Sequence, residues 1–304
     1  MSRIDRRAVL LGGTVGLLAG CSIGDDLAGG ARKQPKGGIG GTGIVGTLTD
    51  FGSLIVNGLR VNVPDALVVQ TAFGEVGQDR LAVGQNLTVE AETITGGLIA
   101  RRVAVVHPVI GVLETVSGAE MLVSGVRVLV EPGGIVSASA GQNVAVSGIW
   151  NGDVVIASRV DALDTDASVI LSGTLRRDAD AGWRVGAMPL LLNNTAGLVD
   201  GSFAIARGFR HGGALSVTSL RTGRFTGAAG ALTALSVEGF LAPDTSAPFY
   251  AVDGLGHSFA EDSQVERFVG QRTLFTGGYD GAFRVSEGLV LEEVFDARRQ
   301  QLRV

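Results

Sequence analysis

The chain has 304 residues, a length that allows two domains of ordinary size or several small ones. Hydrophobic residues make up 45% and charged residues only 18%, and glycine supplies 47 positions, about twice its usual share. This composition makes intrinsic disorder unexpected, and seven prolines without a glycine triplet repeat exclude collagen. The formal net charge is −5, and it becomes more negative without the basic leader, so we expect no nucleic-acid partner.

Residues 1–20 have the pattern of an export signal. Arg3, Arg6 and Arg7 precede an apolar stretch of 13 residues, which is too short to span a bilayer as a helix. The pair Arg6-Arg7 resembles the twin-arginine export signal, and the general secretory route remains the alternative.

The apolar stretch ends in Leu18-Ala19-Gly20-Cys21, which resembles the lipobox of bacterial lipoproteins. The resemblance implies that Cys21 takes a diacylglyceryl group and that acyl chains hold the protein on a membrane. Because Ser22 rather than aspartate follows the cysteine, it also implies an outer-membrane lipoprotein that faces the periplasm or the cell surface. Cys21 is the only cysteine, so an intramolecular disulfide is excluded.

After a glycine-rich segment that we expect to be a flexible tether, the chain repeats one pattern four times. Each copy opens with Gly-x-Leu, and the steps of 65, 62 and 66 residues between the opening glycines indicate tandem small domains. A hairpin turn, an alternating strand and a later glycine follow. The opening glycines are Gly46, Gly111, Gly173 and Gly239, the turn glycines are Gly58, Gly125, Gly186 and Gly254, and the later glycines are Gly84, Gly141, Gly201 and Gly270.

Three of the turns, Asn57-Gly58, Ser124-Gly125 and Asp253-Gly254, suit type I′, which needs positive φ at both positions. Five short strands in about 60 residues, with the long connection after the third strand, predict an OB-like barrel. We therefore expect an all-β fold of four tandem small OB-like five-stranded β-barrel repeats. Because a domain of about 60 residues is marginal alone, neighbouring barrels should pack on one another.

The predicted organisation places an insertion of the first copy within 64–81. The segments are a signal peptide over 1–20, an acylated cysteine and linker over 21–41, repeats over 42–107, 108–165 and 166–222, a linker over 223–234, a fourth repeat over 235–296 and a tail over 297–304.

The opening of the first copy is similar to a bacterial family, the domain of unknown function 5666 (DUF 5666). The similarity is good in the first two copies and fades in the last two, and it implies small exported β-barrels, often in tandem, with no established reaction. The residues that carry it are Gly40-Gly41-Thr42-Gly43-Ile44-Val45-Gly46, Phe51-Gly52-Ser53, Val56-Asn57-Gly58 and Val83-Gly84-Gln85.

Two formal motif matches lack the context that their chemistry needs. The G-x-G-x-x-G match over 41–46 follows a linker and precedes a predicted strand, whereas a dinucleotide site needs a strand before it and a helix after it. The G-x-S-x-G match over 20–24 crosses the expected cleavage site, so it is not interpreted as a nucleophile elbow.

The polar residues offer no spacing typical of a catalytic or metal centre, and we expect no cofactor and no metal. The histidines His107, His211 and His257 lie in different copies, with His107 at a joint and His211-Gly212-Gly213 in a turn rather than an oxyanion loop. One group of carboxylates is interpreted as solvated turn residues, with weak calcium binding as the alternative. That group is Asp161, Asp164, Asp166, Asp178 and Asp180.

Neither the aromatic residues nor the arginine pairs are interpreted as a ligand site. The aromatic residues are interpreted as packing residues, with a ligand-stacking face as the alternative. The arginine pairs are interpreted as solvated rather than phosphate-binding. The residues concerned are Phe51, Trp150, Trp183, Tyr250 and Tyr279, and the pairs Arg101-Arg102, Arg176-Arg177 and Arg298-Arg299.

The sequence thus predicts a non-catalytic binding or scaffolding module of the cell envelope. It would be held on a membrane by its lipid anchor, with envelope proteins or glycans as partners. One alternative is a divergent periplasmic enzyme of hydrolase type, because the twin-arginine route carries folded and often cofactor-loaded proteins. The other alternative is a purely structural spacer.

Overall fold

The computed structural model describes residues 40–164, 168–178, 182–244, 249–256, 259 and 264–291. Within these ranges the chain is all-β, with two short 3₁₀ helices, and its strands form two mixed sheets. No helix among the described residues is long and apolar enough to cross a membrane. The expected leader and lipobox lie outside the described residues.

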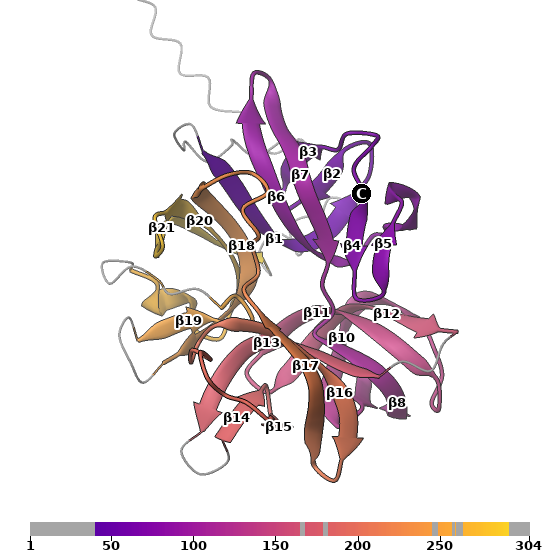
Figure 1. The fold of residues 1–304 in the computed structure, drawn as a ribbon. Coiled ribbons are helices and arrows are strands. Elements are labelled where there is room, and N and C mark those ends of the chain that lie inside the picture. Colours follow the sequence, from indigo (N-terminus) through magenta and orange to yellow (C-terminus); the bar gives the residue numbers. More distant parts are fainter. Residues whose placement is uncertain are drawn as a thin grey trace, which may run out of the picture. The chain divides into compact units, whose positions relative to one another are not determined.

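The first closed barrel has five strands that pair in the order β1, β2, β3, β7, β6, and β6 pairs back to β1 (Figure 1). Only β3 and β7 run parallel within this ring. Strand β3 reads Leu-Arg-Val-Asn and buries alternate residues, as its period of two predicts. The bounds are β1 (Gly41–Asp50), β2 (Leu54–Val56), β3 (Leu59–Asn62), β6 (Asn86–Ile94) and β7 (Gly97–Val105).

The predicted insertion of the first copy forms a side hairpin, in which β4 pairs with both β5 and β7. The hairpin comprises β4 (Val69–Thr71) and β5 (Gly74–Val76), followed by the 3₁₀ helix η1 (Gln78–Arg80).

The second closed barrel repeats the same order of pairing, β8, β9, β10, β12, β11, with β11 paired back to β8. Its parallel pair is β10 with β12. Both barrels are therefore mixed, with one parallel ladder each in an otherwise antiparallel ring. The bounds are β8 (Val109–Ser117), β9 (Glu120–Val123), β10 (Val126–Ser137), β11 (Asn143–Asn151) and β12 (Val154–Leu163).

Flanking strands extend the sheet of the second barrel, because β8 also pairs with β13. These strands pair in the order β13, β14, β15, β17, β16, and β16 pairs with β13. One hydrophobic core contains side chains of both the second barrel and this group, so the two pack on one another. The bounds are β13 (Val169–Asp178), β14 (Gly182–Val185), β15 (Met188–Leu191), β16 (Phe203–His211) and β17 (Ala214–Thr222).

A second set of flanking strands extends the sheet of the first barrel, because β18 runs parallel to β1. Strand β18 also pairs with β19 and β20, and β20 pairs with β21. The last segment of the chain therefore pairs its strands with the first segment rather than with its sequence neighbour. The bounds are β18 (Leu232–Pro243), β19 (Tyr250–Val252), the 3₁₀ helix η2 (Glu266–Phe268), β20 (Arg272–Tyr279) and β21 (Phe283–Val290).

The prediction of four tandem five-stranded barrel repeats is wrong, because two closed barrels and flanking strands are present in the described part of the chain. The described part of the last segment has four strands, and where a third strand was expected Phe259 forms an isolated parallel bridge with Phe283. Gly256, with φ of 72°, interrupts the extended backbone directly after the turn. The alternating run that forms β3 in the first barrel therefore has no equivalent among the described residues here.

The hairpin turns explain the opening glycines of the two barrels. A Cβ on Gly46 would lie 1.9 Å from Asn57 Oδ1, and one on Gly111 would lie 2.2 Å from Ser124 Oγ. Asn57 and Ser124 have φ of 57° and 43°, and the glycine after each also has positive φ, as a type I′ turn requires. At the third predicted turn only Gly254 has positive φ, so type I′ is wrong there.

One local feature does recur in all four segments. The amide of each later glycine donates to the carbonyl of the leucine in the Gly-x-Leu motif, and every one of these glycines has positive φ. The pairs are Gly84 with Leu48 at 2.9 Å, Gly141 with Leu113 at 2.8 Å, Gly201 with Leu175 at 2.8 Å and Gly270 with Leu241 at 3.0 Å. The repeated sequence thus encodes a repeated corner, although the strands around it do not form four equal barrels.

Candidate functional site

A polar cleft of about 510 Å³ lies where β4 of the side hairpin and β7 of the first barrel meet β13, β16 and β17. The volume falls in the range of about 300–1,000 Å³ that is typical of small-molecule sites. Four arginines line the cleft, one from β7 and three from the segment that contains β16 and β17: Arg102, Arg207, Arg221 and Arg224.

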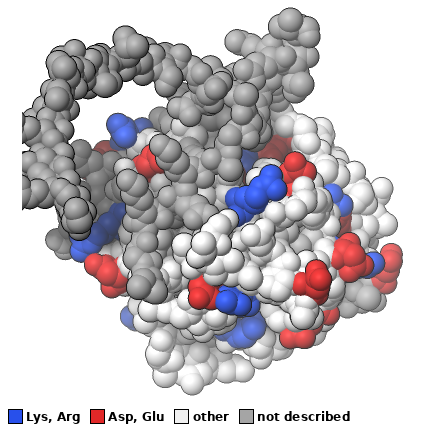
Figure 2. Space-filling view, turned by 90° about the horizontal axis from the view of Figure 1, so that it is seen from above, with Lys and Arg blue, Asp and Glu red and all other residues white. Residues whose placement is uncertain are grey.

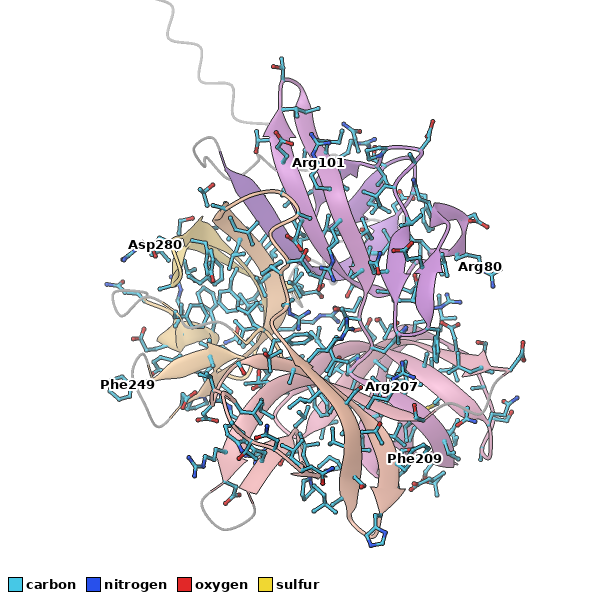
Figure 3. All side chains as sticks on the ribbon, in the orientation of Figure 1. Arg80, Arg101, Arg207, Phe209, Phe249 and Asp280 are labelled. Carbon is cyan, nitrogen blue, oxygen red and sulfur yellow. The ribbon has the colours of Figure 1, made fainter. Side chains whose placement is uncertain are left out.

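Strands β16 and β17 place two of these arginines side by side. Arg207 pairs across the ladder with Ser219, and Ile205 pairs with Arg221. Since side chains alternate between the faces of a strand, Ile205 and Arg207 share one face of β16. Arg207 donates to the carbonyl of Ala72 at 2.5 Å, which links β16 to the β4–β5 hairpin, and Figure 3 shows it on that side of the strand.

Arg102 is held by the buried carboxylate of Glu90, its cross-strand partner in β6 and β7. The two form an ion pair of 3.2 Å, and Glu90 also accepts hydrogen bonds from the amides of Thr226 and Ala228 and from the Thr226 hydroxyl. Burial alone would raise the pKa of Glu90, but these hydrogen bonds and the charge of Arg102 outweigh it and lower the pKa. Glu90 therefore stays ionised and fixes one wall of the cleft.

Arg224 is only 7% exposed and lies over the face of Phe203, 3.8 Å from the ring centroid. Its guanidinium donates to neutral groups: the Thr88 hydroxyl at 3.0 Å and the carbonyls of Gly254 and Leu255. Burial, with a smaller effect from the charge of Arg102, lowers the pKa of Arg224 to about 9. At neutral pH the group still carries its charge, without a carboxylate partner among the described residues.

His107 lies between β7 and β8, at the joint that the sequence predicts, and borders the same cleft. Its Nδ1 is 3.2 Å from the carbonyl of Val146 and 3.3 Å from the hydroxyl of Ser147. Burial lowers the pKa of His107, against weaker raising effects of Val146 and Asp161, so the imidazole is neutral at pH 7.

A second polar crevice, of about 300 Å³, is lined by three arginines, of which two are paired with aspartates and the third, Arg177, lies over the ring of Trp183. Arg176 pairs with Asp244 at 2.7 Å, and Arg184 approaches Asp153 to 3.5 Å. In the same crevice Asp253 accepts a hydrogen bond of 2.8 Å from the amide of Gly152. Burial raises the pKa of Asp253 to about 6, against the lowering effects of Gly152 and nearby arginines.

The positive charge of the first cleft is local. Over the face shown in Figure 2, basic and acidic side chains are interspersed among the described atoms rather than gathered into patches of one sign. The chain as a whole is acidic, with a formal net charge of −5. A concentration of guanidinium groups in one cavity is therefore not a consequence of overall composition.

Sequence reasoning singled out Arg102 and His107 but missed Arg207, Arg221 and Arg224 and the cleft itself, because the cleft residues come from distant parts of the chain. Arg102 and Arg224, for example, are 122 residues apart. The prediction that the arginine pairs are solvated holds for Arg101, whose side chain is 42% exposed, but is wrong for Arg102 and Arg176, which are 23% and 24% exposed. Arg102 forms an ion pair with Glu90, and Arg176 forms one with Asp244.

Of the other candidates from the sequence, some lie where the sequence predicts, one is exposed rather than packed, and the rest lie outside the described residues. Trp150 is 5% exposed and its indole donates to the carbonyl of Ser172 at 2.7 Å, so it is a packing residue, whereas Phe51 is 47% exposed. His211 ends β16 at a turn, as predicted, and residues 41–46 lie inside β1 with no helix after them. The candidates outside the described residues are Arg6, Arg7, Leu18, Ala19, Gly20, Cys21, Asp166, Asp180, His257, Arg298 and Arg299.

Among the described residues no cluster of three or more His, Cys, Asp or Glu side chains could hold a metal ion. Comparison of the chain with family models, with curated proteins and with solved structures found no match. The candidate site therefore rests on its own geometry.

Proposed function

We propose that this chain is a membrane-anchored lipoprotein of the cell envelope whose barrels form a non-catalytic binding module. The arginine-lined cleft is its ligand site. The observation that carries the proposal is the cleft itself: a cavity of about 510 Å³, built by four segments of the chain, with four arginines in its wall, of which Arg224 is buried.

The barrels support a binding role by their topology. Each closed ring has strand order 1-2-3-5-4 with the third and fifth strands parallel, and we propose that both are OB-type barrels of the DUF 5666 kind. Barrels of this type bind ligands such as oligosaccharides on one face and in their loops. Here the cleft borders β7, the fifth strand of the first ring, together with the neighbouring flanking strands.

The hydrolase alternative has one feature in its favour, the contact of 3.3 Å between Ser147 Oγ and His107 Nδ1. A nucleophilic serine needs such a base within reach. The Ser147 side chain is 0% exposed, however, so a substrate cannot reach its hydroxyl. The geometry therefore supports a structural role for this pair at the joint between the barrels.

Filling the cleft tests the ligand site without changing its charge. Ser219 is exposed on β17 and lines the cleft, so Ser219→Trp should occupy it, whereas Ser216→Trp on the same strand lies outside it. The full chain is tagged and used to capture proteins and glycans from envelope extract. We expect a specific ligand with the wild type and with Ser216→Trp and its loss with Ser219→Trp. Equal capture by all three chains would reject the cleft as the site.

The anchor has a separate test. Cys21→Ser should abolish incorporation of labelled fatty acid and move the protein out of the membrane fraction, because acyl chains supply the attachment. Retention of Cys21→Ser in the membrane fraction would contradict the lipoprotein part of the proposal.

A further inference from the structure

The charge around the cleft is unbalanced, and this carries an inference that rests on the proposed function of the same site. Of the four arginines that line the cleft, only Arg102 forms an ion pair within the described part of the chain, with Glu90. Arg207 donates to the Ser168 hydroxyl and the Ala72 carbonyl, which are neutral. The other two guanidinium groups have no carboxylate partner among the described residues.

A buried arginine without a carboxylate partner or a bound anion destabilises the folded state. A buried charge loses the solvation that water supplies, and hydrogen bonds to neutral carbonyls replace only part of it. Arg224 is the extreme case, since it is 7% exposed and bonded to Thr88, Gly254 and Leu255. An anion in the cleft would offset the unpaired charge of Arg224 and that of its neighbours.

The geometry of the donors narrows the class of anion. Planar guanidinium groups match oxyanions such as phosphate through paired N–H donors. Three unpaired positive charges favour a dianion over a single carboxylate. The hydroxyls of Ser219 and Thr222 add polar groups to the wall, and Phe203 and Ile205 add apolar surface.

We propose that the cleft binds the phosphate monoester of a small molecule, with Arg207 and Arg221 facing the phosphate and the rest of the cavity accommodating the organic part. The Arg224 guanidinium, which is bonded to Thr88, Gly254 and Leu255, adds its positive charge from within the wall. The shared chemistry is the dianionic phosphate monoester, which a soluble phosphorylated sugar or the headgroup of phosphatidic acid can supply.

Calorimetric titration of the full chain tests the proposal with defined probes: pyrophosphate, glucose 6-phosphate and unphosphorylated glucose. We expect saturable binding of both phosphorylated probes with a dissociation constant of about 1 mM or tighter, and none of glucose. Added salt should weaken binding, because the contacts are ionic. Failure of both phosphorylated probes to bind would overturn the proposal.

Two variants test whether binding depends on an arginine inside the cleft rather than on the overall charge of the protein. Arg221 is exposed and unpaired among the described residues, so Arg221→Gln should leave the fold intact and weaken binding of glucose 6-phosphate about tenfold, which is the loss of one charge-assisted hydrogen bond. Arg80→Gln, an exposed arginine outside the cleft that is labelled in Figure 3, should bind like the wild type. Equal affinity of Arg221→Gln and Arg80→Gln would also overturn the proposal.

Two further experiments distinguish a lipid from a soluble ligand, and a wrong ligand class from a wrong binding site. Vesicles that contain phosphatidic acid, whose headgroup is a phosphate monoester, should compete with glucose 6-phosphate if the ligand is a lipid headgroup, and should not if it is soluble. If Ser219→Trp abolishes capture of an envelope ligand while Arg221→Gln leaves it unchanged, the cleft is a binding site but not one for phosphate. If Ser219→Trp has no effect, the proposed function itself fails.

Discussion

The two polar cavities use the same residue type in opposite ways. In the crevice near Arg176 and Arg184, both of these guanidinium groups lie against an aspartate, so the two arginines join segments of the fold. Arg177, which also lines the crevice, lies over the ring of Trp183. In the cleft near Arg207 and Arg224, the guanidinium groups contact carbonyls and hydroxyls and keep their net charge. An arginine that is paired with an aspartate stabilises the packing of the two segments it joins. An arginine without a carboxylate partner keeps a positive charge that can attract an anion. The difference separates a structural crevice from a candidate binding site.

Removing Glu90 should have the largest effect on stability. Glu90→Gln keeps the shape but removes the carboxylate that pairs with Arg102 and accepts from the 226–228 segment. We expect a loss of about 3 kcal/mol in the free energy of unfolding, measured by denaturant titration, because breaking a buried pair leaves a charge uncompensated. The control Glu92→Gln, from an exposed pair with Arg101, should cost less than about 1 kcal/mol. Equal losses would contradict the assigned role of Glu90.

Removing the charge of Asp253 should have a pH-dependent effect. Its pKa is raised to about 6 in the folded chain, above the unfolded value, so the folded state loses stability as pH rises from about 4 to 6. Asp253→Asn keeps an acceptor for the Gly152 amide and should gain about 2 kcal/mol at pH 8 but nothing at pH 4. Thermal melts across this range check the gain. The exposed Asp79→Asn is the control, and a gain that does not vary with pH would count against the explanation.

A direct contrast between the cavities should have a smaller effect. Arg176→Gln leaves the partly buried Asp244 without its guanidinium partner and should cost about 1–2 kcal/mol. Arg221→Gln removes no ion pair among the described residues and should change the free energy of unfolding by less than about 0.5 kcal/mol. Denaturant unfolding of both variants checks the contrast, and a larger loss for Arg221→Gln would reverse it.

Local features of the fold were predictable from sequence because they depend on neighbouring residues. Asn57-Gly58 and Ser124-Gly125 form the predicted turns, with positive φ at both positions. The period of two in β3 correctly gave its buried face. The interruption at Gly256 was missed, because the similar turn before it suggested that a third strand would follow.

Contacts between residues far apart in the sequence could not be predicted from local sequence patterns. The parallel pairing of β1 with β18 joins segments about 190 residues apart, and no local periodicity indicates it. The cleft has the same origin, since Arg102, Arg207 and Arg224 meet only after the strands have packed. The adjacent pair Arg101-Arg102 drew attention in the sequence, but only the structure separates the exposed residue from the one in the cleft.

Amide hydrogen exchange of the full chain, with and without saturating pyrophosphate, tests the central claim most directly. The account predicts slower exchange in peptides that cover 102–107 and 203–226, no change in 182–190, and loss of the effect in the double variant Arg207→Gln/Arg221→Gln. Protection confined to other segments, or protection that survives the double variant, would contradict the assignment of the arginine-lined cleft as an anion-binding site.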